Sequence, residues 1–239
     1  MRKMSFIIPH KEDPLIDRLL SSLGKQTCRN FEVIIVDSSD DNSSLKTIRR
    51  WSKSLNPKVL SVNCGRGTAR NIGAKLAETD ILVFVDADVV LPRNFAEGLA
   101  DMFAENSGLV AVGFPIYPTE PNKVSRVFYR FLRFLDRSSY RYGKPRIPTT
   151  CAAYRSSVFQ SRFFLDIIGE DVLFSADIMK YGEALFAKHI KVLEEPRRWD
   201  DCSKIIKNLW HYTPAFIVNF LIIFGLHNVI MPTQEVKRT

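Results

Sequence analysis

The sequence predicts an α/β fold in which a mostly parallel, Rossmann-like sheet is flanked by helices. The first observation behind this prediction is that short apolar runs, rich in branched and aromatic residues, alternate with segments of helical periodicity. The second is that aspartates directly follow two of these runs, at positions 37 and 86–88. Ligands of open α/β sheets bind outside the carboxyl ends of the strands, so these acids mark a candidate site.

Each expected strand is an apolar run bounded by turn-forming residues or by a helical segment. Strands are expected at 4–8, 31–36, 57–62, 81–85, 109–114 and 190–193. A first helix is expected to open with Asp13 as its N-cap and Pro14 as its first residue. Further helices are expected at 43–54, at 93–105 and at 122–142. The segment 65–73 is expected to lead into another helix, which reaches about residue 77. Gly73 is expected to let its helix pack closely against a neighbour.

A chain of 239 residues, of which 46% are hydrophobic, fits one domain with an appendage. We expect the domain over residues 1–200 and a hydrophobic helical segment over 201–239. The apolar run 215–226 is interrupted only by Asn219 and is shorter than the roughly 20 residues that span a bilayer. It is expected to lie at a membrane interface or to span it marginally, and a helix buried in a homodimer is the alternative.

The formal charge of +8 favours acidic partners, such as a nucleic acid, an anionic membrane or a phosphorylated substrate. The acidic strand ends argue against a nucleic acid, because they would repel its phosphates. The four cysteines are scattered without a C-x-x-C, which argues against a thiolate zinc site and a disulfide framework. We expect them to be reduced in a cytoplasmic setting, and we expect no signal peptide because residues 5–9 already form a strand.

The segment 122–142 predicts a two-faced helix. Basic residues recur at every third or fourth position on one side, namely Arg126, Arg130, Arg133, Arg137 and Arg141. Apolar residues do the same on the other side, namely Val124, Phe128, Phe131 and Leu135. Basic amphipathic helices are typical of membrane surfaces, and such a helix could also hold a phosphorylated lipid acceptor. An ordinary solvated charged face is the alternative.

The acidic residues carry the prediction of chemistry. Paired carboxylates at a strand end suit a hard divalent cation that also holds phosphate oxygens, so Asp86 and Asp88 indicate a metal-dependent enzyme acting on a diphosphate. Taken alone, the pair could equally be a solvated turn. Asp37 follows another strand, and Glu170 and Asp171 follow a segment of small residues. An acid that no metal neutralises can act as a general base.

Together these segments resemble family 2 of the nucleotide-sugar glycosyltransferases, which have the GT-A fold. The matching segments are S-F-I-I-P at 5–9, F-E-V-I-I-V-D at 31–37, A-R-N-I-G at 69–73, V-D-A-D at 85–88 with Pro92, and G-E-D at 169–171. The resemblance covers roughly residues 4–200 and implies an inverting transfer of sugar from a nucleoside-diphosphate sugar, assisted by Mn²⁺ or Mg²⁺.

The resemblance also implies roles for particular residues. Pro9, Asp37 and Arg70 would line the nucleotide pocket, and Asp86 would contact the nucleoside. Asp88 would ligate the metal between the diphosphate and the protein. The base that deprotonates the acceptor hydroxyl would be Asp171.

The chain departs from the family pattern in several places. Pro9 is followed by H-K-E-D rather than T-Y-N-E, and the family's second aspartate after the second strand is a serine here, at position 38. The segment E-P-R-R-W at 195–199 resembles the Q-x-x-R-W of processive polysaccharide synthases. In that interpretation Arg198 would brace the diphosphate and Trp199 would face the acceptor, whereas an Arg-Trp packing pair is the alternative.

We therefore expect a membrane-associated, metal-dependent, inverting glycosyltransferase at the cytoplasmic face of a membrane. Its acceptor is expected to be a hydroxyl or phosphate on a lipid or glycolipid. A catalytically degenerate nucleotide-sugar-binding protein on the same fold is one alternative. A sugar-nucleotide pyrophosphorylase is another, although residues 9–13 do not supply the Gly-rich basic triphosphate loop that it needs.

Overall fold

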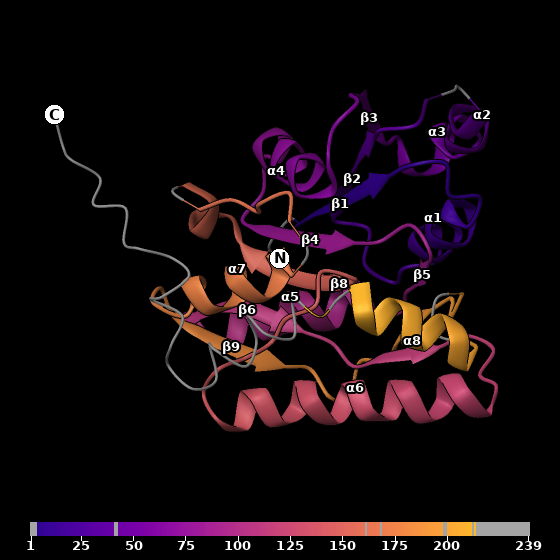
Figure 1. Cartoon of the computed structure of the whole chain (residues 1–239). Helices are drawn as coiled ribbons and strands as arrows, with labels where there is room; N and C mark the ends of the chain where they lie inside the picture. Colours follow the sequence, from indigo (N-terminus) through magenta and orange to yellow (C-terminus); the bar gives the residue numbers. More distant parts are fainter. Residues whose placement is uncertain are drawn as a thin grey trace, which may run out of the picture.

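The computed structural model describes residues 4–40, 43–160, 162–167, 169–197, 200–211 and 213. The strands of its main sheet lie in the order β3-β2-β1-β4-β8-β6-β9 (Figure 1). Their bounds are β1 Met4–His10, β2 Phe31–Asp37, β3 Lys58–Ser61, β4 Ile81–Val85, β6 Leu109–Gly113, β8 Cys151–Arg155 and β9 Glu183–Phe186. A smaller sheet has the order β5-β10-β7, with β5 Val89–Val90, β7 Ile116–Pro118 and β10 Val192–Glu194.

Helices cover both faces of the main sheet (Figure 1). Their bounds are α1 Ile16–Gly24, α2 Ser43–Arg50, α3 Ser52–Leu55, α4 Arg66–Leu76, α5 Phe95–Glu105, α6 Lys123–Arg141, α7 Glu170–Ile178 and α8 Cys202–His211. Alternate residues of β1 divide between the two layers of core: Phe6 and Ile8 pack with α1 and α5, while Ile7 packs with α7. This alternation is what the two-residue period of a strand requires when both faces are buried.

The predicted α/β fold with a mostly parallel sheet is confirmed. β1 pairs in parallel with β2 and β4, and β2 pairs in parallel with β3. The sequence did not lead us to expect β8, which runs antiparallel between β4 and β6. Its residues Ala152 and Ala153 have weak strand propensity, but both are fully buried between the neighbouring strands. Tertiary contact, rather than local preference, therefore makes this segment a strand.

Two expected helices have different bounds in the structure. The first begins at Ile16, not at Pro14, and its N-cap residue Leu15 makes no side-chain capping bond. Asp13 instead accepts a hydrogen bond from the amide of Leu15 at 2.9 Å, in the turn before the helix. The second expected helix, at 43–54, is interrupted at Trp51, whose indole Nε1 donates to Asp17 Oδ1 at 2.9 Å. Anchoring of this side chain on α1 accounts for the break.

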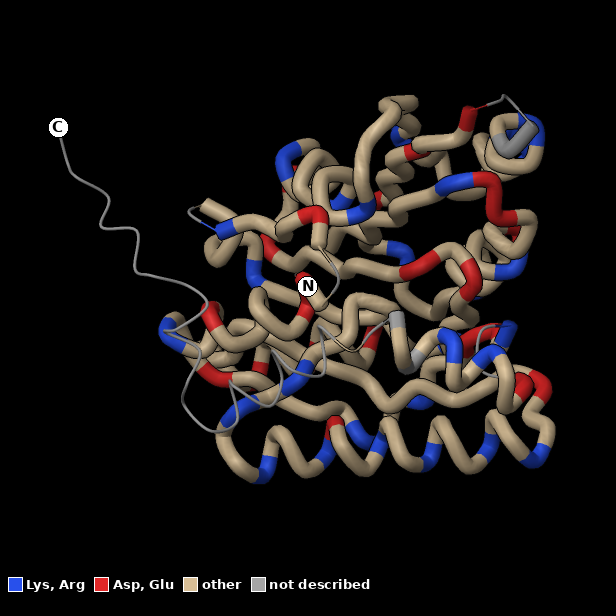
Figure 2. Tube along the Cα trace, viewed as in Figure 1, with Lys and Arg blue, Asp and Glu red and all other residues tan. Residues whose placement is uncertain are grey.

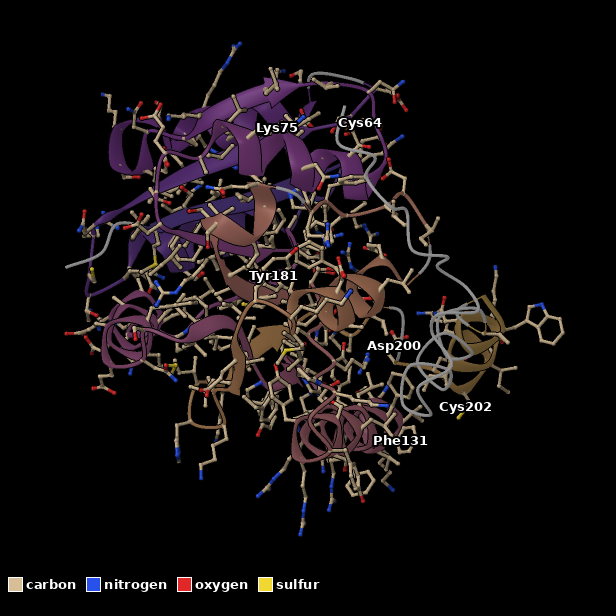
Figure 3. All side chains as sticks on the ribbon, turned by 90° about the vertical axis from the view of Figure 1, so that its left-hand side faces the viewer. Cys64, Lys75, Phe131, Tyr181, Asp200 and Cys202 are labelled. Carbon is tan, nitrogen blue, oxygen red and sulfur yellow. The ribbon has the colours of Figure 1, made fainter. Side chains whose placement is uncertain are left out.

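The two-faced helix forms as α6, but its faces differ from the prediction. Phe128 is buried against the sheet, as expected, whereas Phe131 is 51% exposed. Phe131 joins Val127 and Phe134, which are 68% and 66% exposed, in an apolar strip along the outer side of the helix. Figure 3 labels Phe131 beside α6, at the surface of the molecule. Among the expected basic residues, Arg133 departs from the row, because it lies over the ring of Tyr117 at 3.9 Å.

The C-terminal segment is described only as far as α8 and residue 213. The expected apolar helix over 215–226 lies outside the described residues. Within the described part of the chain, no helix combines the length and the apolar character that a membrane crossing requires. Cys28, Cys64, Cys151 and Cys202 are not joined in disulfides.

Gly73 brings α4 against the central strand β1. A Cβ atom at this position would lie 2.3 Å from Ile7 Cγ2, which is far inside van der Waals contact. Ile7 is fully buried and has no room to retreat. The predicted packing role of Gly73 is therefore confirmed, and it sets how closely α4 approaches the strand that ends at the pocket described below.

Replacing Gly73 with alanine is expected to destabilise the fold by about 1–3 kcal/mol, the usual cost of overpacking a filled core. Gly98→Ala in α5 is the matched control, because its new Cβ would lie 3.3 Å from the flexible end of Ile190. Helix propensity favours this control change by up to about 1 kcal/mol. Urea unfolding measures both, and equal stability of the two variants would contradict the packing role of Gly73.

Candidate functional site

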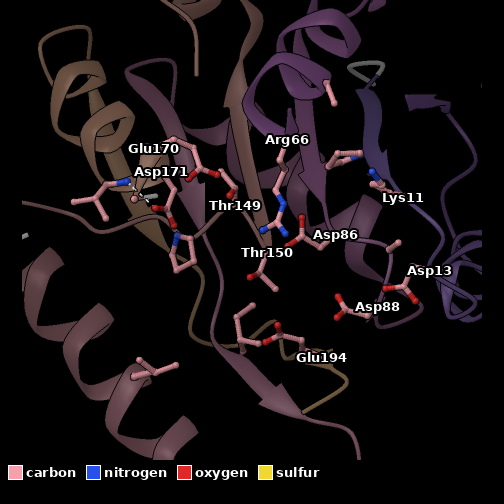
Figure 4. Close-up of a pocket in the computed structure, with 18 of the residues that line it drawn as sticks. Lys11, Asp13, Arg66, Asp86, Asp88, Thr149, Thr150, Glu170, Asp171 and Glu194 are labelled. Carbon is pink, nitrogen blue, oxygen red and sulfur yellow. Dashed lines mark hydrogen bonds between the residues drawn. The ribbon is translucent and has the colours of Figure 1, made fainter. Parts of the chain in front are cut away.

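A pocket of about 510 Å³ opens at the carboxyl ends of β1 and β4, where the sequence predicted a site. Figure 4 shows its labelled residues around one open space. Asp86, Asp88 and Asp13 lie on one side, and Glu170 and Asp171 lie on the other. The remaining walls come from the end of β1, the start of α4, the inner side of α6 and β10. They include Pro9, Arg66, Tyr129, Arg133 and Glu194.

The turn between β4 and β5 presents the two predicted aspartates. The amide of Asp86 donates to the carbonyl of Thr150 at 3.0 Å, and its own carbonyl accepts from Val89 at 3.2 Å. These bonds fix the turn so that Asp86 and Asp88 both line the pocket. Burial raises the pKa of the Asp88 carboxyl, and the nearby charge of Asp86 raises it further. A cation at this turn would relieve that cost.

Arg70 lies behind the pocket wall rather than on it. Its side chain is fully buried on α4, and it joins two carboxylates from different elements. One guanidinium nitrogen lies 2.9 Å from Asp86 Oδ1, and the other lies 2.7 Å from Glu170 Oε1. Burial of a guanidinium is tolerable only when it is paired in this way. Arg70 therefore links the aspartate turn to the start of α7 across the floor of the pocket.

Asp171 stands in the first turn of α7, which follows Gly169 in the left-handed conformation with φ 84°. Its Oδ1 atom accepts from the amide of Val172 at 2.9 Å, and its carbonyl accepts from the Ser175 hydroxyl at 2.6 Å. The carboxylate also lines the pocket (Figure 4). Burial, followed by the charge of Asp171, raises the pKa of the adjacent Glu170. The two acids differ in role, since Glu170 holds Arg70 and Asp171 faces the open space.

Asp37 and Pro9 stand where β2 and β1 end. Pro9 lines the pocket. Asp37 is buried, and its Oδ1 atom lies 3.0 Å from Nδ1 of His10 and 3.1 Å from the amide of Ser39. The sequence placed no role on His10, although it follows the family's proline. In the structure it fixes the Asp37 carboxylate beneath the pocket edge.

Arg197 is a residue of the site that sequence reasoning missed. Its Nη2 atom lies 2.5 Å from Asp13 Oδ2 and 3.1 Å from Asp88 Oδ2. The neighbouring Arg198, and with it Trp199, falls outside the described residues, so the roles predicted for these two stay predictions. A clue lay in the sequence, since E-P-R-R-W contains two adjacent arginines and only the second matched the synthase pattern.

A second buried ion pair lies at the α6 end of the pocket. Asp136 is paired with Arg146, and both residues line the pocket. Burial raises the pKa of Asp136 to about 6, even though Arg146 opposes this shift. The basic pattern of α6 hid this pair, because Asp136 stands in the sequence as an isolated acid among arginines and Arg146 lies beyond the helix.

The carboxylates suit a divalent cation only in company with a ligand. Within the described ranges, no group of three or more histidine, cysteine, aspartate or glutamate side chains is arranged to hold a metal. Mg²⁺ is commonly bound by one or two carboxylates together with substrate phosphates and water, rather than by an all-protein cage. Asp88, with its partly buried carboxylate at the pocket rim, fits that kind of site.

Comparison with known proteins agrees with this geometry. Residues 5–163 match the sequence profile of glycosyl transferase family 2. Poly(ribitol-phosphate) beta-N-acetylglucosaminyltransferase TarS of Staphylococcus aureus (strain Mu50) is 37% identical over 112 residues, which cover 44% of this chain and 20% of TarS. The chain thus spans about a fifth of the length of that relative.

Two solved structures show the same fold. Mannosyltransferase PcManGT from Pyrobaculum calidifontis, in complex with GDP-Man and Mn²⁺, superimposes with a TM-score of 0.72 over 96% of this chain and 70% of that one, at 19% identity. Staphylococcus aureus TarS in complex with UDP-GlcNAc superimposes with a TM-score of 0.63 over 99% of this chain and 76% of that one, also at 19% identity.

Proposed function

This chain belongs to glycosyl transferase family 2, and from that premise we propose that it transfers a sugar from a nucleoside-diphosphate sugar to an acceptor hydroxyl or phosphate, with inversion at the anomeric carbon. The observation that carries the proposal is the arrangement of acids around one pocket. Asp86 and Asp88 come from the end of β4, and Asp171 faces them from the start of α7 (Figure 4). This arrangement puts groups that suit a diphosphate and a candidate base on opposite sides of one space.

The nucleotide half of the site is formed by the ends of β1 and β2 and the start of α4. Pro9 and Ser38 line it, and Asp37 is fixed just beneath. Gly65 and Arg66 begin α4, so the helix N-terminus and a guanidinium both face the pocket. A helix N-terminus and an arginine favour phosphate. The two structural neighbours, which are complexes with UDP-GlcNAc and with GDP-Man, are compatible with a donor of this class.

Asp88 would hold a Mn²⁺ or Mg²⁺ ion together with the donor diphosphate. When bound, such an ion supplies neutralisation of the charge that develops on the leaving diphosphate. Asp86 is positioned differently, because its carboxylate is already paired with Arg70 and its place nearer the nucleotide half suits contact with the nucleoside. The PcManGT structure is a complex with both GDP-Man and Mn²⁺, which supports this class of ion.

Asp171 would take the proton from the acceptor hydroxyl. The Val172 amide and the Ser175 hydroxyl hold this residue in the first helical turn, so its carboxylate is oriented before the acceptor arrives. Inversion requires one base on the face of the sugar opposite the leaving group. The position of Asp171 across the pocket from Asp88 supports this role, and Glu170 is already paired with Arg70.

We propose that residues 1–200 act as the catalytic domain and that 201–239 form a membrane-associating segment at the cytoplasmic face. The outer side of α6 is a second feature that favours membrane association. Exposed basic residues follow this helix beside the apolar strip of Val127, Phe131 and Phe134, and Figure 2 shows the basic positions along it. They are Lys123, Arg126, Arg130, Arg137 and Arg141. An anionic bilayer complements both the charge and the apolar strip, and its headgroup region would carry a lipid-linked acceptor.

The first prediction concerns the metal. Asp88→Ala is expected to abolish sugar transfer, and excess chelator is expected to do the same to the intact protein, with recovery on addition of Mn²⁺. The exposed Asp101 of α5 provides the control Asp101→Ala, which should retain full activity. Donor turnover, followed as release of nucleoside diphosphate, measures all of these. Full turnover in excess chelator would show that the metal proposal is wrong.

The second prediction concerns the base. Asp171→Asn preserves shape and removes basicity, so kcat is expected to fall by about 10²–10⁴-fold while donor affinity changes little. Asp177→Asn is the matched control in the same helix, because Asp177 pairs with Lys180 and Arg162 away from the pocket. A normal kcat for Asp171→Asn would remove this residue from the mechanism.

The third prediction concerns the membrane. The intact chain is expected to float with anionic liposomes at low salt, and reversing Arg126, Arg130 and Arg137 to glutamate should weaken this at least about ten-fold, since each basic residue contributes about 1 kcal/mol. Raising the salt to 1 M should weaken binding of the intact chain, because the Debye length falls to about 3 Å. Any binding that persists at high salt would come from an apolar anchor.

Reversal of Lys46, Arg49 and Lys53 on α2 and α3 is the control for a general change of charge. These residues are exposed and lie at the opposite side of the molecule from α6 (Figure 1). The proposal fails if both triple variants bind liposomes equally, or if the intact chain stays in solution with anionic liposomes at low salt.

A further inference from the structure

Arg197 is paired with Asp88, the carboxylate that the proposed function assigns to the metal ion. Its guanidinium lies between Asp13 and Asp88, at 2.5 Å and 3.1 Å from one carboxylate oxygen of each. Figure 4 shows these two aspartates side by side at the pocket rim. The Asp88 side chain is 15% exposed and that of Asp13 is 19% exposed, whereas that of Arg197 is 44% exposed. The cation is therefore the accessible member of the group.

The backbone that carries Arg197 is tethered on both sides. The amide of Glu195 donates to the carbonyl of Asp88 at 3.2 Å, and the Glu195 carboxylate is bound by Arg18 at 2.8 Å and by Thr119 at 3.0 Å. The carbonyl of Arg197 itself accepts from Lys204 Nζ at 3.3 Å. With the chain held in place, rotation of the long side chain is the simplest way for the guanidinium to leave the two aspartates.

A divalent ion and this guanidinium cannot both hold Asp88 without strong repulsion, because charges a few ångströms apart interact strongly at a partly buried site. A displaced guanidinium would then lack an anionic partner. The donor supplies one, since its diphosphate lies next to the metal and suits arginine. In this exchange the metal ion replaces the Arg197 guanidinium at Asp13 and Asp88. The donor diphosphate then replaces these two carboxylates as the partner of Arg197.

We propose that Arg197 is a built-in counter-ion that holds the metal position in the free protein and moves to the donor diphosphate when metal and donor bind together. This inference rests on the proposed function, because it requires a donor diphosphate at the pocket. It makes the binding of the ion and of the nucleotide mutually dependent. Such coupling is reciprocal and typically amounts to 5–150-fold in affinity.

Arg197→Gln tests the proposal, because it removes the charge and keeps a side chain of similar polarity. Mn²⁺ alone, titrated by electron paramagnetic resonance, is expected to bind this variant at least about five-fold more tightly than the intact chain. UDP and GDP, titrated by calorimetry at saturating Mn²⁺, are expected to bind at least about five-fold more weakly. Arg197→Lys keeps the charge and should restore both affinities toward those of the intact chain.

The control variant is Arg18→Gln. It removes the bond from Arg18 to Glu195 in the same loop and keeps the Arg197 guanidinium beside Asp88. It should change neither affinity by more than about two-fold, well below the range expected for coupling. Unchanged or weaker Mn²⁺ binding by Arg197→Gln would overturn the counter-ion role. Failure of the proposed function would show differently, as an intact chain that binds neither nucleotide with Mn²⁺. A purely structural role of Arg197 would weaken both ligands together, which also contradicts the proposal.

Discussion

Arg70 is the constraint on which the rest of the pocket depends. It is fully buried, and a buried guanidinium without its partners would cost several kcal/mol, so Asp86 and Glu170 must both stay within reach. Asp86 closes β4 and Glu170 opens α7, and these elements are separated by more than eighty residues in the sequence. The ion pairs therefore fix the distance between the two walls of the pocket. Asp88 is two residues from Asp86, and Asp171 is next to Glu170. The ion pairs of Arg70 therefore also determine where Asp88 and Asp171 lie.

Three arginines of the site pair with acids that are wholly or largely buried. Arg70 forms ion pairs with Asp86 and Glu170, Arg146 with Asp136, and Arg197 with Asp88. Burial still raises the pKa of Asp88 and Glu170 despite these partners. The neighbouring charges of Asp86 and Asp171 add to this effect of burial, so negative charge is concentrated at this edge of the sheet. A divalent ion would lower the negative charge at this edge, and in the proposed function it would also offset the repulsion between these acids and a donor diphosphate.

The sequence indicated the fold and the acids of the site because both depend on local pattern. Apolar runs such as 81–85 are strands in almost any context, and aspartates after them reach the sheet edge by necessity. Partnerships between distant residues could not be predicted. Arg70 matched a motif, but the residues next to it in the sequence do not indicate that it is buried between two acids. The motif led us to expect it in the lining of the nucleotide pocket. β8 and the role of Arg197 were not predicted for the same reason. The small residues of β8 form a strand because β4 and β6 flank it, and Arg197 belongs to the site because Asp13 and Asp88 lie beside it.

Thermal unfolding with a panel of nucleoside-diphosphate sugars, each with and without Mn²⁺, tests the proposed donor site most directly. A ligand that binds only the folded protein stabilises it by about 2.7 kcal/mol at one hundred times its Kd. We predict that at least one donor raises Tm markedly with Mn²⁺ and much less without it. Free sugars and nucleoside monophosphates, which lack the diphosphate, should have little effect. If no nucleoside-diphosphate sugar raises Tm in the presence of Mn²⁺, the pocket is not a donor site and the proposed function is wrong.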